Sequence, residues 1–146
     1  MEYHLFASDR EPEIIKRKAR QQKKKQRRAA PTTRPLYYWS RETPLYVRAM
    51  VLADKTLFIA GPPDIIDEEQ IFKNPDAPGV AGKLREQTSA LDGKKGASLH
   101  VVSASDGKKL AEYRLETVPV FDGMAAANGR LYLSMKNGRV QCFEGK

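Results

Sequence analysis

The sequence predicts an all-β protein built of antiparallel strands, and three observations support this fold class. Residues 37–60 align without a gap with residues 111–134 at an offset of 74, so the chain contains an internal repeat. Short runs of leucine, aromatic and β-branched residues follow turn signals such as Asn128-Gly129, which is typical of hairpins. No crossover helix separates most of these runs, so we expect antiparallel pairing in a meander. Repeated units of this kind stack because a single unit cannot bury its apolar face alone.

Single residues match across the repeat. The identities are Glu42/Glu116, Thr43/Thr117, Met50/Met124, Ala53/Ala127 and Leu57/Leu131, and Trp39/Tyr113, Asp54/Asn128, Phe58/Tyr132 and Ile59/Leu133 keep their chemical type. A second similarity links residues 4–9 to residues 100–105, and each copy of it precedes the first repeat in chain order.

Nine strands follow from this pattern. We expect them at residues 3–7, 36–41, 45–53, 56–61, 98–103, 109–115, 119–127, 130–135 and 139–143. The turn residues between them are Asp106, Gly107, Asn128, Gly129, Asn137 and Gly138. At these dipeptides we expect type I′ turns, because both central residues of that turn need a positive φ, which Gly and Asn tolerate best.

A strongly basic insertion at residues 10–35 separates the first two strands. Its segment 16–28 contains nine cationic residues and no acid: Lys16, Arg17, Lys18, Arg20, Lys23, Lys24, Lys25, Arg27 and Arg28. The net charge of +8 and the pI of 9.6 therefore describe this segment, and the remaining residues are nearly neutral together. The expected structure is a long solvated loop, disordered or partly helical, because like charges repel and apolar periodicity is lacking.

Two further interpretations of the basic segment stay open. It is a candidate site for the phosphates of nucleic acid, anionic lipid or another anionic polymer, which basic clusters bind through counterion release. A nuclear localisation signal is the other. No aromatic residue interrupts the run, which argues against base stacking.

A second insertion, at residues 62–96, is predicted to contain a helix. Residues 67–72 place acids where a helix N-terminus favours them, and Asn74 and Pro75 end that turn. Val80, Leu84, Thr88 and Leu91 recur at helical spacing, so residues 80–92 are expected to form a short amphipathic helix closed by Gly93. The acids Asp64, Asp67, Glu68 and Glu69 lack the spacing of a calcium-binding loop.

Catalytic patterns are scarce in the sequence. His4 and His100 occupy equivalent repeat positions, which favours the same structural role for both. Cys142 is the single cysteine and is expected to be a small buried residue of an apolar strand. Phosphate-binding glycine loops, metal-binding Cys or His pairs and nucleophile motifs are not found. The sequence thus predicts neither a catalytic site, a cofactor site nor a metal site.

The segments His100–Leu110, Pro119–Ser134 and Asn137–Phe143 together resemble the PQQ-type (quinoprotein-like) β-propeller repeat. The similarity is good over residues 98–143 and fair over 36–61, and residues 97–146 match the pattern best. The family includes the outer-membrane barrel-assembly lipoprotein and secreted bacterial proteins. Ser103 stands where the family usually has Asp, and Ala111 stands near its blade-docking Trp, so Trp39 and Tyr113 are the expected substitutes in blade packing.

This resemblance implies that residues 1–146 form a single partial propeller of about two four-stranded blades with extra edge strands. The chain would begin within a blade and end one strand short of another, as the C-terminal part of a longer propeller. Complete propellers have about 4–8 blades. An isolated piece would expose strand edges and apolar faces, so self-association is expected.

Two classes of function are compatible with these observations. We favour a non-catalytic scaffold or binding module that presents its loops to a protein partner or to the remaining blades. The alternative that the resemblance implies is a PQQ-dependent quinoprotein oxidoreductase, although the tryptophan, acidic base and calcium ligands that such an enzyme needs cannot be assembled from this sequence. No apolar run is long enough to span a membrane. The resemblance places the parent protein in the periplasm or cell envelope if it carries a signal peptide.

Overall fold

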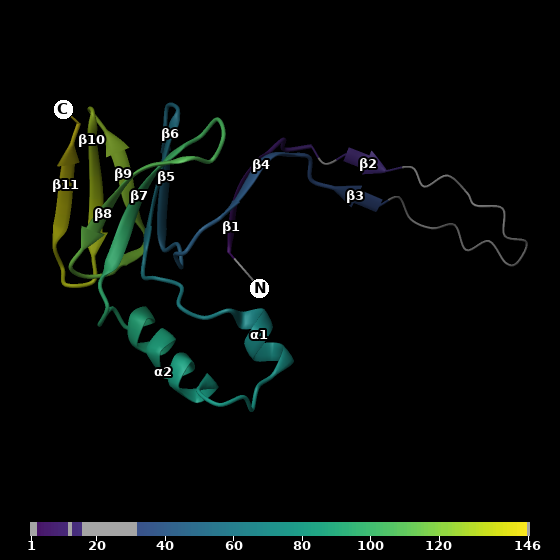
Figure 1. The fold of residues 1–146 in the computed structure, drawn as a ribbon. Helices are drawn as coiled ribbons and strands as arrows, with labels where there is room; N and C mark the ends of the chain where they lie inside the picture. Colours follow the sequence, from purple (N-terminus) through teal and green to yellow (C-terminus); the bar gives the residue numbers. More distant parts are fainter. Residues whose placement is uncertain (1–2, 12, 16–31, 146) are drawn as a thin grey trace, which may run out of the picture.

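Antiparallel strands dominate the computed structural model, which describes residues 3–11, 13–15 and 32–145 (Figure 1). The elements in chain order are β1 (His4–Ser8), β2 (Glu13–Ile15), β3 (Thr32–Arg34), β4 (Tyr37–Glu42), β5 (Ala49–Ala53), β6 (Thr56–Gly61), α1 (Glu68–Lys73), α2 (Val80–Leu91), β7 (Ala97–Ser103), β8 (Lys109–Leu115), β9 (Pro119–Ala127), β10 (Arg130–Met135) and β11 (Val140–Glu144). The prediction of an all-β, antiparallel fold is confirmed.

The central sheet has four strands in the order β5-β6-β7-β8. β5 and β6 form a hairpin in which Ala53 pairs with Thr56 around the turn Asp54-Lys55. β6 and β7 pair although both helices separate them in the sequence, and Ile59 lies opposite His100. β8 then covers the far edge of β7, with Leu99 opposite Tyr113. The helical insertion therefore begins after β6 and ends before β7 at the same end of the sheet, where Gly61 pairs with Ser98.

A second sheet has three strands in the order β11-β10-β9. The offset of 74 places β10 over β6, so the repeat seen in the sequence relates the two sheets. β9 and β10 meet at Asn128 and Gly129, whose φ angles of 51° and 72° are those of a type I′ turn.

At the other two expected type I′ turns the geometry differs, because only the glycines have positive φ, 71° at Gly107 and 80° at Gly138. Met135 N donates to Arg139 O and Gly138 N donates to Met135 O, so this loop has three residues and ends in a left-handed glycine. Asp106 Oδ1 and Asn137 Oδ1 each accept from the backbone N–H two residues ahead. These two side chains act as turn acceptors, so their own φ need not be positive.

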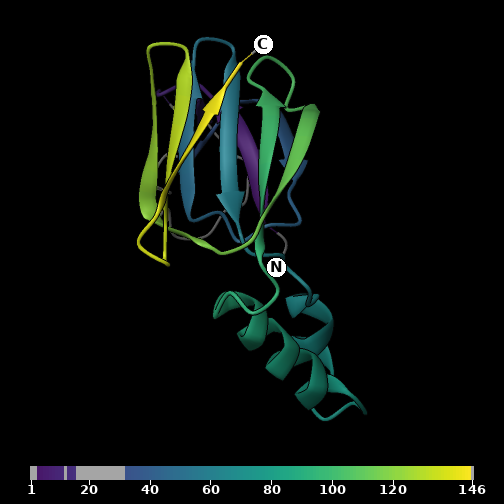
Figure 2. The same ribbon diagram turned by 90° about the vertical axis from the view of Figure 1, so that its left-hand side faces the viewer.

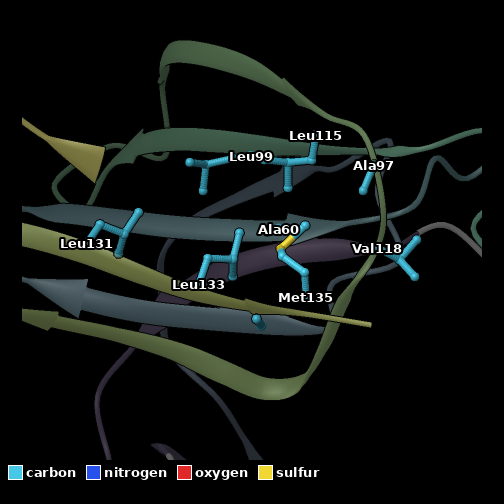
Figure 3. Packing of buried hydrophobic residues seen from close by; sticks show 9 residues of the cluster. Ala60, Ala97, Leu99, Leu115, Val118, Leu131, Leu133 and Met135 are labelled. Atoms are coloured by element: carbon cyan, nitrogen blue, oxygen red, sulfur yellow. The ribbon is translucent and has the colours of Figure 1, made fainter. Parts of the chain in front are cut away.

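The sheets pack face to face around the main core. Ala60, Leu99 and Leu115 of the central sheet contact Leu131, Leu133 and Met135 of β10 (Figure 3). A smaller cluster on the opposite face joins Leu45, Ile59 and Val102 to Leu5 of β1. The β9–β11 sheet, the central sheet and the β1–β4 pair therefore follow one another as three layers (Figure 1).

The N-terminal strands form two antiparallel pairs, β1 with β4 and β2 with β3. The pairing of β2 with β3 was not predicted, because residues 10–35 were expected to be a loop throughout. Neither strand has the apolar run that signals a strand, and pairing with a distant partner decides their conformation. Residues 16–31, which include the basic segment, lie outside the described residues.

Two helices replace the single one expected in the insertion, and both lie at one end of the sheets (Figure 2). Asp67 caps α1 by accepting a hydrogen bond from Gln70 N, and Lys73 forms an ion pair with Glu69 one turn away. The helix nonetheless has only six residues. Its local capping signals were present in the sequence, but they do not give its length.

The second helix, α2, ends where Gly93 was expected to close it. Gly93 has a φ of 90°, Gly93 N donates to Ala90 O and Lys94 N donates to Ser89 O, which is a Schellman motif. The buried residues of α2 are Gln87 and Ala90. The predicted apolar stripe is therefore incorrect in detail, since Leu84 is exposed and a polar side chain takes the inner position.

Candidate interaction surface

β11 ends its sheet without a neighbouring strand among the described residues. In the central sheet the equivalent strand is β7, and β8 covers its outer edge. An uncovered strand edge presents unpaired N–H and C=O groups, which makes it a template for another strand. The edge of β11 is therefore the first component of a candidate interaction surface.

Gln141 marks the position at which a neighbour of β11 is missing. It lies opposite Leu133 in the way that His100 lies opposite Ile59. His100 has a partner on the next strand, because its Nε2 is 3.5 Å from Glu112 Oε1 of β8. Gln141 Oε1 is buried and has no hydrogen-bond partner. A buried acceptor without a donor is costly, so this amide indicates where a polar partner would fit.

A cleft of about 800 Å³ opens between the two sheets beside this edge. Phe58, Leu99 and Tyr113 line it on the central sheet, and Leu131 and Phe143 line it on the other. The ring centroids of Tyr113 and Phe143 are 6.4 Å apart, and Tyr113 is half exposed. The cleft is thus an apolar groove with aromatic walls that continues the open edge of β11.

A second apolar surface lies on the opposite side of the central sheet. Met50 and Leu52 of β5 are 55% and 61% exposed, yet they lie opposite the buried Ile59 and the half-buried Leu57. Directly opposed residues share a face of the sheet, so all four face the β1–β4 pair. That pair has only two strands, and Met50 and Leu52 remain uncovered.

Trp39 and Gly107, both singled out in the sequence, lie against each other between two layers. Trp39 Nε1 donates to Ala104 O at 2.9 Å, and Arg41 Nε donates to Asp106 O at 3.3 Å. A Cβ atom on Gly107 would lie 2.5 Å from Trp39 Cε3. β4 is therefore joined to the turn between β7 and β8. Tyr113 lies in a different place, at the cleft.

The two histidines each lie opposite a glutamate on the neighbouring strand, His4 opposite Glu42 and His100 opposite Glu112. Their surroundings differ, because His4 is exposed and His100 is 3% exposed. Burial lowers the pKa of His100, and Lys109 adds to this effect while Glu112 opposes it. A hydrogen bond from Lys109 is the main reason why the pKa of Glu112 is lowered.

Cys142 is exposed, so the prediction that it is buried was wrong. Along β11 it points to the opposite side from Phe143, which packs against the core. Its side of the sheet faces away from the central sheet. The apolar pattern of the strand correctly indicated a β-strand but could not indicate which face another layer covers.

Two acids of the insertion, Glu68 and Asp64, lie close to each other and affect the pKa values of their surroundings. Tyr46 hydroxyl donates to Glu68 Oε1 at 2.9 Å, and the Tyr46 ring is 4.5 Å from that of Tyr3. Burial, followed by Tyr3 and Glu68, raises the pKa of Tyr46 well above its usual range. Burial and the nearby Glu68 also raise the pKa of Asp64. Within the described ranges, no three His, Cys, Asp or Glu side chains group as metal ligands.

Several residues that hold the layers together were not identified from the sequence. Arg48 Nη2 donates to Leu91 O at 2.6 Å, and its guanidinium lies 5.3 Å from the ring centroid of Phe121. Gln87 bridges Ile65 N and Pro63 O. Each contact joins residues more than 20 positions apart, and polar residues in a loop or on a helix carry no local signal for such partners.

No protein-family model, curated protein or solved structure is significantly similar to this chain. Within the part of the chain that the structure describes, no helix has the length and apolar character needed to cross a membrane. The cationic residues of the basic segment lie outside the described residues.

Proposed function

We propose that this chain is a non-catalytic scaffold of the β-propeller type, in which the three layers are consecutive blades and the open edge of β11 receives a strand of a protein partner. The observation that carries the proposal is the combination of an uncovered edge, a buried unpartnered amide at Gln141 and an apolar cleft beside them. Main-chain hydrogen bonds give affinity in such strand addition, and pockets for alternate side chains give specificity.

The pairing of β8 in the central sheet supports a particular kind of partner strand. β8 pairs with β7 through residues that alternate between small or aromatic side chains on one face and charged side chains on the other, as in Ala111, Glu112 and Tyr113. Because β11 is the repeat equivalent of β7, a strand of similar alternation would place a polar group beside Gln141 and an aromatic ring beside Val140, on the face of the sheet that carries Cys142.

A peptide with the sequence of residues 107–117 tests this proposal directly. We expect it to bind and to slow amide hydrogen exchange in β11, while exchange in β7 stays unchanged because β8 already covers that strand. A peptide of the same composition in scrambled order is the control. If neither peptide protects β11, or both protect it equally, the edge is not a specific acceptor and the proposal fails.

Binding of an anionic polymer by residues 16–28 is a second candidate function. The observation in its favour is the β2–β3 pair, which extends the N-terminal ribbon away from the sheets and places Ile15 opposite Thr32, the described residues on either side of this part of the chain (Figure 1). The expected result is retention on heparin that falls steeply with salt, as counterion release requires. Deletion of residues 16–28 should abolish it, and equal retention of the deletion variant would contradict this function.

A further inference from the structure

We propose that copies of this chain assemble head to tail, with β4 of a second copy pairing with β11 as the fourth strand of the β9–β11 sheet. In the single chain β4 pairs with β1. In this assembly β4 of the second copy releases its own β1 and pairs with β11 of the first copy instead. The inference rests on the proposed function, since it uses the same open edge, and it names a second copy as the partner.

β4 is the strand of this chain that the repeat relates to β8. Residues 37–42 align with residues 111–116 at the offset of 74, with Trp39 over Tyr113 and Glu42 over Glu116. β8 occupies the fourth position of the central sheet. β4 therefore carries the sequence pattern that the fourth position of the β9–β11 sheet lacks.

The partner that β4 has within its own chain is small. β1 has five residues, and the β1–β4 sheet has only two strands. Isolated two-stranded pairs are only marginally stable, whereas a sheet of three or more strands with a buried face can be stable by itself. Leu5 is the residue of β1 that packs in the apolar cluster, and Phe6 on its other face is 55% exposed. Exchange of β1 for β11 gives up the β1–β4 ladder and the ring contact between Phe6 and Tyr37, but it forms a new ladder and completes a four-stranded sheet.

Side chains on the two strands match in the register that β7 and β8 use. Leu99 opposite Tyr113 corresponds to Val140 opposite the second copy's Trp39, and His100 opposite Glu112 corresponds to Gln141 opposite Tyr38. Tyr38 is 64% exposed, and its hydroxyl, which bonds Asp9 in the single chain, would exchange that partner for the buried Gln141 Oε1. In the same register, Val101 opposite Ala111 corresponds to Cys142 opposite Tyr37.

The exposed faces of the molecule match in this arrangement as well. Trp39 of the second copy keeps its contact with Ala104 of the same copy, so the second copy's central sheet follows its β4. That sheet then lies against the outer face of the first copy's β9–β11 sheet, which carries the exposed Cys142. Met50 and Leu52 of the second copy, uncovered in the single chain, face β9 and β10 of the first. Because the contact is heterologous, it generates a ring or an open filament.

A cysteine substitution tests the register, because Cys142 is the single cysteine of the chain. In Tyr37→Cys the introduced thiol would lie opposite Cys142 of a neighbouring copy, and we expect disulfide-linked multimers on mild oxidation. Tyr37 is 52% exposed, and its ring contacts that of Phe6 of β1, a contact that the exchange of β1 for β11 gives up in any case. Tyr38→Cys is the matched control, because in this register it lies opposite Gln141 and not opposite Cys142. The double variant Tyr37→Cys/Cys142→Ala should form no disulfide-linked multimers.

Equal crosslinking of both variants, or none in Tyr37→Cys, overturns the proposal. A second measurement is the native mass of a variant that lacks residues 4–8, in which β4 is free to pair. We expect its mass to rise by about twofold or more relative to the single chain, as for a head-to-tail contact, and a monomer contradicts the assembly. Protection of β11 by the peptide 107–117 without crosslinking would refute only this inference, whereas loss of both refutes the proposed function too.

Discussion

Gly107 and Trp39 show how one residue can join two layers of the molecule. The glycine has a φ of 71°, and the indole ring lies where its Cβ would be. Trp39 could be recognised as a packing residue from the repeat, since it aligns with Tyr113. The sequence could not show that the two aromatics contact different neighbours, because that depends on which layer follows each strand.

Substitution of Gly107 by Ala should destabilise the protein more than substitution of Gly129 by Ala. Both glycines have nearly the same φ, 71° and 72°, so the backbone cost is shared, but a Cβ at Gly129 meets no atom within 4 Å. At Gly107 it would clash with Trp39, and overpacking costs roughly 1–3 kcal/mol. Urea denaturation measures this difference in the free energy of unfolding. Equal destabilisation of both variants would show that the Trp39 contact carries no energy.

His100 should make the fold less stable as the pH falls. Burial holds its folded-state pKa below the ordinary value of 6.5, so the unfolded chain binds the proton more readily and stability is lost as pH drops below about 6.5. We expect His100→Gln to flatten the dependence of the free energy of unfolding between about pH 7.5 and 5.5, a window around that ordinary value. His4→Gln, at the exposed equivalent position, is the control substitution, and a dependence that stays as steep in His100→Gln as in the wild type would contradict this role for His100.

At the scale of elements, the hairpins and the position of α2 were predictable, and the buried side of α2 was not. Asn128-Gly129 produces its turn because the two residues tolerate positive φ wherever they stand. α2 was located correctly because its closing glycine and its spacing are local. Which side of α2 is buried was missed, because Gln87 contacts residues 63 and 65 through hydrogen bonds that apolar periodicity does not reveal.

Gln87→Ala should detach the helical insertion from the end of the central sheet. The side chain is 4% exposed and accepts from Ile65 N at 2.7 Å while it donates to Pro63 O. Loss of these bonds leaves partly buried backbone groups unpaired, at a cost of roughly 1–3 kcal/mol. Faster hydrogen exchange in α2 is the expected readout. Arg85→Ala, on the exposed side of the helix, should leave exchange unchanged, and an identical effect of both variants would contradict this role for Gln87.

The folded protein should not bind PQQ, the cofactor of quinoprotein enzymes. A scaffold has no site for PQQ, so we expect addition of PQQ with calcium to change neither the absorbance spectrum of the cofactor nor the melting temperature of the protein. A saturable rise in melting temperature, which ligand binding to the folded state produces, would instead favour the oxidoreductase alternative. Calcium alone is the control for nonspecific effects of the cation.

The sequence by itself determined the all-β class, the repeat and most strand positions, because alternation, turn dipeptides and helix closure are local properties of a chain. Only the tertiary structure showed that β2 pairs with β3, that Cys142 is exposed and that the side-chain oxygen of Gln141 is buried without a partner. Each of these depends on which strand or layer lies beside the residue. Burial and pairing depend on contacts between distant segments, and the sequence of one segment does not show which segment lies beside it.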